Sequence, residues 1–201
     1  MHVATPVMVE LGAYWGHYSM WMMKKKPLSR VVLIDESAEN LGSAQYNFGL
    51  NGYRGKLSVG RIGFCDDTLG NICTTHNLPI IDILHVDIQG AEVDLLQDSI
   101  KILSSGSVRI IFLSTHSNYI HGLCYRLLQF CGFRIEVSSD FDHHSTSYDG
   151  FILAAYHDLD PIFPGFLPWG RADICEANPD QIVDYIRQVG TLRAGWSSGL
   201  R

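Results

Sequence analysis

The segment 9–19, VELGAYWGHYS, places a carboxylate before two glycines, Gly12 and Gly16, that are four residues apart. A triphosphate-binding loop has a lysine and a hydroxyl residue directly after its last glycine, and a dinucleotide-binding turn has a third glycine. This segment has neither feature. Glu10 at a strand end would repel a pyrophosphate but would suit a cationic cofactor without phosphate, such as one with an ammonium and a sulfonium group. The pattern favours such a cofactor or, alternatively, a plain strand–turn–helix bend.

A second acidic site ends the next apolar run, RVVLIDE, about 20 residues beyond the glycine turn. There Asp35, with Glu36 beside it, is placed to accept hydrogen bonds from both hydroxyls of a ribose. The two acids also suit the N-terminus of a helix, where they favour the helix dipole while Ser37 caps the first turn. Taken together with the glycine turn, the spacing favours the ribose role.

The segment 81–96, IDILHVDIQGAEVDLL, carries polar residues where an apolar strand turns into a helix. Asp87 and Gln89 lie at this turn, and a further apolar run ends at His116. Polar side chains at the ends of buried strands are typical of a ligand cleft. We therefore expect these strand ends to face one site.

The elements that position these residues alternate between strands and helices. Apolar runs bounded by turn residues predict strands at 6–13, 30–36, 55–64, 81–88, 108–116, 133–139 and 149–157. Helical spacing predicts helices at 17–26, 38–50, 91–103 and 121–131. Several strands are apolar at consecutive positions, which is typical of a parallel sheet buried on both faces. The predicted class is α/β with helices on both faces, and the last two strands form an antiparallel hairpin around the polar loop 140–148.

One domain, residues 1–157, contains all of these strands. The remaining residues, 158–201, are rich in proline, glycine and aromatics and are predicted to form an appendage packed on the domain. They include one predicted helix, 178–189, with Asn178 as its N-cap and a proline at the first helical position. Because a core strand begins by Pro6, we also expect the native protein to have a further N-terminal segment.

The composition excludes several classes of protein. The 201 residues are 46% hydrophobic and 18% charged, which is typical of a globular chain and not of a disordered one. The net charge of −6 argues against a nucleic-acid binder held by its overall field. No apolar stretch reaches the roughly 18 residues of a membrane span. Five scattered cysteines without a CxxC pair favour a reduced, cytoplasmic setting.

Four blocks of the sequence, taken in order, resemble the FkbM-type methyltransferases, a branch of the class I enzymes that use S-adenosylmethionine. The blocks are ELGAYWG (10–16), Asp35 with the pair EN (39–40) and NFGLNG (47–52), HVDIQGAE (85–92), and THS (115–117) with DG (149–150). His85 stands where the family commonly has lysine, and Gln89 where it has glutamate. Both departures resemble a sub-branch that carries the pattern I-L-H-x-D-I-Q-G. The resemblance runs from about residue 6 to residue 156.

The resemblance implies a Rossmann-like sheet of seven strands in the order 3-2-1-4-5-7-6, mostly parallel, with the seventh strand antiparallel. It implies transfer of a methyl group from S-adenosylmethionine, usually to a hydroxyl of a saccharide or small metabolite. It further implies a set of cofactor-binding residues: Glu10, Gly12, Ala13, Tyr14, Gly16, Ser19, Asp35, Glu36, Asp66, Asp67, Asp87, Ile88 and Gln89. Within this set Glu10 and the glycines shape the methionine pocket, and Asp35 holds the ribose. Asp66 or Asp67 accepts from the adenine amino group, or else the two form a solvated turn.

Two residues are candidates for the catalytic base, because an alcohol loses a proton as it is methylated. His116 follows an apolar strand and titrates in the right range, while Asp87 acts either as the base or as the group that positions it. The alternative for His116 is a partly buried histidine bonded to backbone. A metal site that combines His116, His121, His143 and His144 with Asp87 or Asp142 lacks paired ligands on one element, so no metal is predicted. Rival functions are a nicotinamide-dependent oxidoreductase and a fold member that binds the cofactor without turnover.

Overall fold

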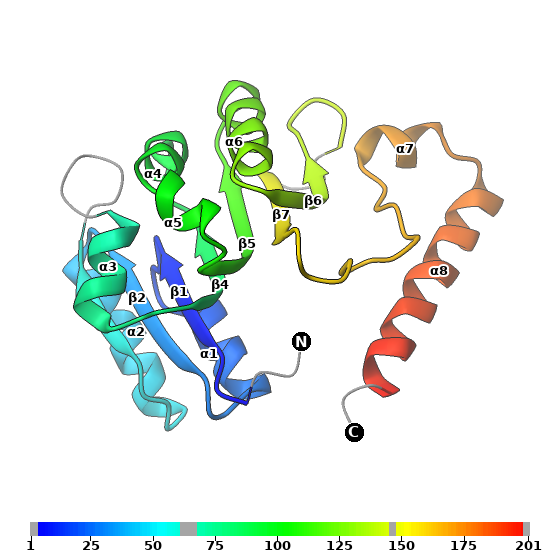
Figure 1. Cartoon of the computed structure of the whole chain (residues 1–201). Helices are drawn as coiled ribbons and strands as arrows, with labels where there is room; N and C mark the ends of the chain where they lie inside the picture. Colours follow the sequence, from blue (N-terminus) through cyan, green and yellow to red (C-terminus); the bar gives the residue numbers. More distant parts are fainter. Residues whose placement is uncertain (1–3, 61–67, 145–147, 199–201) are drawn as a thin grey trace.

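The computed structural model describes residues 4–60, 68–144 and 148–198. Its centre is a seven-stranded sheet in the order β3-β2-β1-β4-β5-β7-β6 (Figure 1). The strands are β1 (Val7–Leu11), β2 (Arg30–Asp35), β3 (Lys56–Val59), β4 (Ile81–Val86), β5 (Val108–Thr115), β6 (Phe133–Ser139) and β7 (Gly150–Tyr156). The predicted strand order and class are confirmed.

The sheet is parallel from β3 through β5, and β7 runs antiparallel to both of its neighbours. The hairpin predicted from the short polar connection between the last two strands is therefore present. In parallel strands the carboxyl ends meet at one edge. The polar residues that follow β1, β2, β4 and β5 are accordingly brought to the same edge of the sheet.

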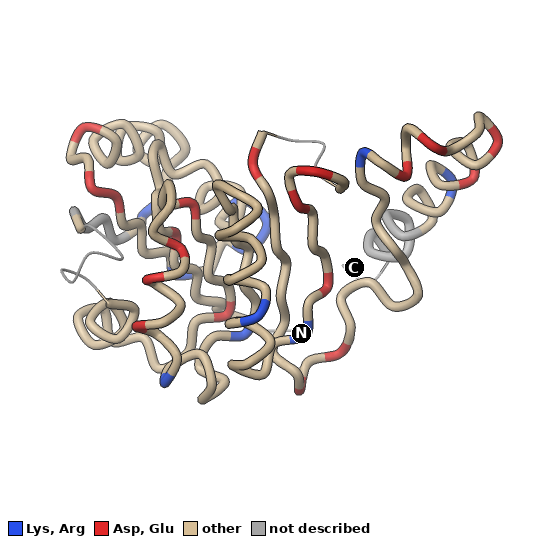
Figure 2. The backbone as a smooth tube through the Cα atoms, turned by 90° about the horizontal axis from the view of Figure 1, so that it is seen from above, with Lys and Arg blue, Asp and Glu red and all other residues tan. Residues whose placement is uncertain are grey.

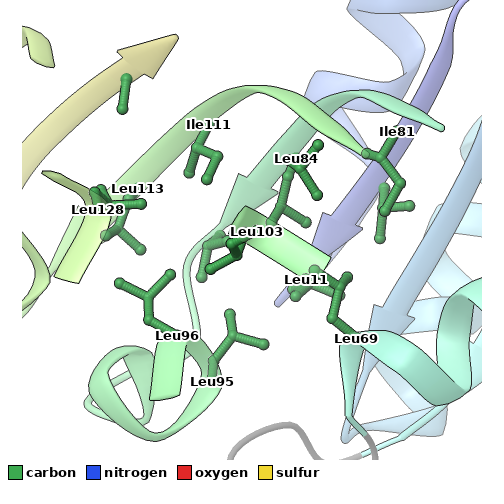
Figure 3. Close-up of a cluster of buried hydrophobic side chains, with 14 of the residues drawn as sticks. Leu11, Leu69, Ile81, Leu84, Leu95, Leu96, Leu103, Ile111, Leu113 and Leu128 are labelled. Atoms are coloured by element: carbon green, nitrogen blue, oxygen red, sulfur yellow. The ribbon is translucent and has the colours of Figure 1, made fainter. Parts of the chain in front are cut away.

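Helices lie on both faces of the sheet (Figure 1). They are α1 (His17–Lys25), α2 (Ala38–Leu50), α3 (Leu69–His76), α4 (Glu92–Asp98), α5 (Ile100–Ser104), α6 (Asn118–Phe130), α7 (Arg171–Glu176) and α8 (Pro179–Ser198). Side chains of α1 and α2 pack with Met8 and Leu33 on one face. Side chains of α3 to α6 pack with the alternate residues, such as Leu11 and Leu84, on the other. Figure 3 shows this second cluster, whose leucines are fully buried.

The helices differ from the predicted ones in several places. The single helix predicted at 91–103 is two helices, because the backbone leaves helical geometry at Ser99 (φ −102°, ψ 4°). Helix α6 begins three residues earlier than predicted, where the Ser117 hydroxyl accepts from the Ile120 N–H and caps it. Helices α3 and α7 were not predicted, and α8 continues beyond residue 189. These differences lie at helix ends and in short helices, where periodicity is a weak signal.

The residues after β7 contact the domain next to β6 (Figure 1). The Arg171 guanidinium donates to the carbonyls of Phe141 and Asp142, and the Ile162 N–H donates to Glu136. Trp169 stacks on Tyr185 of α8 with ring centroids 4.5 Å apart. The bonds of Arg171 and Ile162 hold the segment against β6 and the loop that follows it, and the ring stacking joins two parts of the segment.

The charged residues of the chain are not gathered into one segment. Figure 2 shows the acidic positions spread over the sheet domain and the last two helices. No helix among the described residues is both long enough and apolar enough to cross a membrane.

Candidate active site

A cavity of about 520 Å³ lies at the carboxyl edge of β1, β2 and β4. Nine of the predicted cofactor-binding residues line it: Glu10, Gly12, Ala13, Tyr14, Asp35, Glu36, Asp87, Ile88 and Gln89. Gly16 and Ser19 lie outside it, and Asp66 and Asp67 fall outside the described residues. The structure thus brings together the strand ends that the sequence predicted to share one site.

The glycine turn after β1 is shaped by a close backbone approach. Gly12 has a φ of 72°, and a Cβ atom built on it would lie 1.7 Å from the Asp87 carbonyl oxygen. Only glycine accommodates both the left-handed backbone and this approach. Gly16, at φ 76°, begins α1 and faces Leu33 and Phe48 at distances that leave no room for a side chain. The first glycine therefore shapes the cavity, and the second packs the helix against the sheet.

Glu10 is a buried carboxylate at the cavity, with an exposed fraction of 1%. Ser19 donates to its Oε2 atom through both its hydroxyl and its backbone N–H (2.9 Å), and the Tyr18 N–H donates to Oε1 at 3.4 Å. Burial raises the pKa of Glu10 to about 7, and the hydrogen bonds from Ser19 and Tyr18 offset this effect only in part. A cation bound beside Glu10 would therefore stabilise the charged form of its carboxylate.

Asp35 ends β2 and fastens two turns to each other. Its Oδ2 atom accepts the Tyr14 N–H of the glycine turn at 2.8 Å, and Oδ1 accepts the Ser37 N–H at 2.9 Å and the Asn40 amide at 3.0 Å. Since a carboxylate has about four acceptor positions, these three bonds leave one for a ligand. Ser37 also caps α2 through its hydroxyl, as the helix-capping alternative proposed. Glu36, by contrast, is exposed and lines the cavity.

His85 is a cavity residue that the sequence analysis did not assign to the site. It pairs in register with Glu10 on the neighbouring strand, so both side chains emerge on the same face of the sheet. Its ring lies 4.0 Å from that of Tyr18, and its Nδ1 atom is buried without a hydrogen-bond partner among the described residues. Burial, with a contribution from nearby His17, lowers the pKa of His85 to about 4. His85 is therefore neutral near pH 7.

The cavity is also lined by residues outside the predicted cofactor-binding set: Trp15, His17, Tyr18, Ser37, Asn40 and Gly60. Most of them follow a predicted site residue within a few positions. The signal that identifies His85 is strand register. Glu10 and His85 can be placed on the same face of the sheet only when the pairing of β1 with β4 is known.

A second group of ionisable side chains surrounds His116, which follows β5. Its Nδ1 atom lies 2.5 Å from Oε1 of Glu92, a carboxylate with an exposed fraction of 0%. Its Nε2 atom makes no hydrogen bond, although Oδ1 of Asp87 lies 3.2 Å away and Oδ1 of Asp149 lies 3.8 Å away. Burial raises the pKa of Asp87, and His116 offsets that effect in part. Since Asp87 also lines the cavity, His116 lies directly behind the cavity wall.

The other histidines of the metal alternative have partners of their own. His121 is bonded through its two ring nitrogens to Thr115 and Ser138, both at 2.9 Å. His143 and His144 lie beside Asp140 in the loop after β6. Within the described ranges, no group of three or more His, Cys, Asp or Glu side chains is arranged to hold a metal ion.

Comparisons with known proteins support the resemblance seen in the sequence. Residues 59–135 match the family described as "Methyltransferase FkbM domain". A protein of Jannaschia sp. (strain CCS1) named "Putative methyltransferase" is 38% identical over 63 residues, which are 31% of this chain and 22% of that protein. The matched part thus spans about a fifth of the length of that relative. The resemblance to FkbM-type methyltransferases is confirmed over residues 59–135.

Solved structures show the fold over a longer stretch. TrmK of M. capricolum, in complex with S-adenosyl-homocysteine, has a TM-score of 0.55 at 12% identity, covering 98% of this chain and 93% of TrmK. A precorrin-6y C5,15-methyltransferase from Geobacter metallireducens GS-15 has a TM-score of 0.53 at 15% identity and covers 75% of this chain and 78% of its own. The fold is therefore the Rossmann-like fold of class I methyltransferases.

Proposed function

We propose that this chain is an S-adenosylmethionine-dependent methyltransferase that methylates a hydroxyl group on a saccharide or small metabolite. The main support for this proposal is the cavity at the carboxyl edge of β1, β2 and β4. Glu10 and Asp35 both line it, and the described residues around it include no phosphate-binding loop. The match of residues 59–135 to the FkbM domain supports the reaction class.

The cavity fits the proposed cofactor in size and in charge. Its volume of about 520 Å³ falls within the range of roughly 300–1,000 Å³ that is usual for small-molecule sites. Burial raises the pKa of Glu10 to about 7. The ammonium group of the cofactor, bound beside Glu10, would stabilise the charged form of its carboxylate. Asp35 keeps one acceptor position, and Glu36 offers another carboxylate, for the ribose hydroxyls.

The chain's own residues have three tasks in the reaction. When bound, the cofactor supplies a methyl group that its sulfonium already activates, so the protein chiefly has to align the acceptor and exclude water. Asp87 borders the cavity beside the strand end that carries His116. We assign to the Nε2 atom of His116, which is buried and makes no hydrogen bond, the role of taking the proton of an acceptor hydroxyl.

A second cavity suggests where the acceptor lies. It measures about 270 Å³ and is lined by β6, β7 and the segment before α7, including Ser138, His144, Phe151 and Trp169. In the order of the sheet, β5 and His116 lie between this cavity and the cofactor cavity. Hydroxyl, imidazole and aromatic groups together suit a hydroxylated ligand such as a saccharide. We expect Trp169→Ala to raise the KM for the acceptor and leave cofactor affinity unchanged.

Calorimetry with S-adenosylmethionine tests the cofactor proposal, with reduced nicotinamide cofactor as the comparison ligand. Binding of S-adenosylmethionine, and product formation with a panel of hydroxyl compounds, are the expected results. No heat and no thermal shift at millimolar ligand would refute the proposal. Cofactor binding that is unaffected by His116→Ala, with no methylated product, would instead indicate a fold member without turnover.

A further inference from the structure

Glu92, the first residue of α4, carries a carboxylate that is completely removed from solvent. Burying such a group is costly unless it is paired and hydrogen-bonded. Its Oε1 atom lies 2.5 Å from His116 Nδ1 and accepts the Gly90 N–H at 3.0 Å, while Oε2 has no partner among the described residues. The imidazole of His116 is thus the main compensation for burying Glu92.

The same carboxylate also holds the turn that carries the cavity residues. Gln89 and Gly90 both have positive φ angles, 54° and 104°, so the chain between β4 and α4 is tightly turned. The bond from the Gly90 N–H to Glu92 fastens this turn. A single side chain therefore sets both the orientation of His116 and the backbone next to Asp87.

The two ring nitrogens of His116 face different surroundings. Nδ1 faces the buried Glu92, and Nε2 faces Asp87, which lines the cofactor cavity. A carboxylate at Nδ1 favours the tautomer with the proton on that atom and leaves the Nε2 lone pair available. The ring has only 15% of its side chain exposed, and Glu92 holds its orientation. The shorter contact at Nδ1, 2.5 Å against 3.2 Å at Nε2, favours the proton on Nδ1.

We propose that Glu92 is the positioning residue for His116, a role that rests on the proposed methyltransferase function. Glu92 keeps the proton on Nδ1, so Nε2 accepts the proton of the acceptor hydroxyl. The oxygen–methyl bond forms as the sulfur–methyl bond breaks, and the sulfur keeps the electron pair of that bond. The imidazolium that results lies beside the carboxylates of Glu92, Asp87 and Asp149 and later releases its proton to water.

The ionisable groups around Glu92 and His116 come from several elements. Asp87 and Asp149 lie near the Nε2 atom of His116, and Cys124 of α6 lies near Glu92. Burial, reinforced by Glu92, raises the pKa of the Cys124 thiol to about 12, so it stays neutral at ordinary pH. The negative charge around the imidazole is therefore carried by the three carboxylates.

The first test is Glu92→Gln, which keeps the size of the side chain and removes its charge. We expect kcat to fall about 10- to 100-fold, as for the loss of a charge-assisted hydrogen bond, with cofactor Kd and acceptor KM unchanged. The acid limb of the pH–rate profile should move to lower pH, because one of three negative charges beside the imidazole is gone. Glu136→Gln is the matched control, since Glu136 is a buried carboxylate paired with Arg134 away from the cavity, and its kcat should stay unchanged.

A double variant separates positioning from a general loss of structure. If Glu92 acts through His116, then Glu92→Gln combined with His116→Ala should lower kcat no further than His116→Ala alone. Additive losses would overturn the proposal. Glu92→Asp, which keeps the charge and withdraws it from Nδ1, serves as the second variant if Glu92→Gln does not fold, and we expect the same loss of kcat.

Nuclear magnetic resonance of protein labelled with ¹⁵N at histidine gives a readout that does not depend on activity. The His116 signal, assigned by its absence in His116→Ala, should report a proton on Nδ1 in a strong hydrogen bond. That signature should be lost in Glu92→Gln and kept in Glu136→Gln. An unchanged signal in Glu92→Gln would overturn the proposal. A normal signal in a wild-type protein that binds no S-adenosylmethionine would instead refute only the proposed function.

Discussion

The two halves of the sheet's carboxyl edge hold their carboxylates in different ways. At β1 and β2, Glu10 and Asp35 accept hydrogen bonds from backbone N–H groups, a serine hydroxyl and an asparagine amide. At β4 and β5, Asp87 and Glu92 lie against His116 instead. The donors of the first half do not titrate, whereas the second half combines such donors, the Gly90 N–H and the Gln89 amide, with His116, which does.

We propose that this difference gives the two halves separate tasks. Backbone N–H groups keep their protons at any pH and hold a turn in one shape, which suits recognition of a fixed ligand. A histidine among carboxylates can take up and release a proton, which suits acid–base chemistry. Single substitutions in each half test this division.

Gly12→Val should have the largest effect, because it destroys the turn on which the recognition half depends. The new side chain meets the Asp87 carbonyl and requires a left-handed backbone, so we expect a loss of at least about 4 kcal/mol in the free energy of unfolding. Urea denaturation measures this loss. Gly42→Ala in α2 is the control; with no atom within 4 Å of the new Cβ, it should be neutral or stabilising. Equal stability of the two variants would contradict the argument.

The pair of Glu10 and His85 predicts two opposite dependences of stability on pH. Between pH 4.5 and about 7, folded Glu10 keeps a proton that the unfolded chain has released, so its contribution falls as the pH rises. Between pH 6.5 and about 4, folded His85 lacks a proton that the unfolded chain binds, so its contribution falls as the pH drops. Each contribution is up to about 3 kcal/mol.

Urea denaturation from pH 4.5 to 7 checks this with Glu10→Gln and His85→Gln. Because the two effects oppose each other in the wild type, removing one exposes the other. On acidification, Glu10→Gln should lose stability relative to the wild type, and His85→Gln should gain it. Parallel pH curves for all three proteins would contradict the pKa shifts.

His116→Ala probes the half that titrates. We expect kcat to fall about 100-fold or more, the usual cost of losing a general base, while calorimetry finds the cofactor Kd unchanged. His143→Ala, whose exposed side chain lies in the loop after β6, is the control and should keep full activity. Weaker cofactor binding by His116→Ala would show that the two halves do not divide binding from chemistry.

Asp35→Asn should have the smallest effect on stability. An amide has one acceptor oxygen, so either the Tyr14 N–H or the Ser37 N–H loses its partner, at a cost of about 1–2 kcal/mol. Cofactor affinity should fall as well, whereas kcat at saturation should not. Asp160→Asn, at an exposed position after β7, is the control. A kcat loss as large as that of His116→Ala would contradict the division.

Much of the fold followed from local signals. Consecutive apolar residues predicted the parallel strands, and the short polar connection 140–148 predicted the terminal hairpin. Short helices escaped prediction, because α3 and α7 have too few residues for a period to be recognised. The break at Ser99 was missed for a related reason, since the apolar spacing continues across it.

Glycine spacing and strand period are local properties of the chain, so the residues at the strand ends could be predicted from the sequence. It placed Glu10, Asp35, Asp87 and His116 at one edge once the sheet was read as parallel. The partners of these four side chains depend on how distant segments pack. Glu10 lies beside His85 because β1 pairs with β4 in one register, and Glu92 meets His116 because α4 packs beside α6, which begins shortly after His116. Such contacts depend on register and packing between distant segments, which no local pattern encodes.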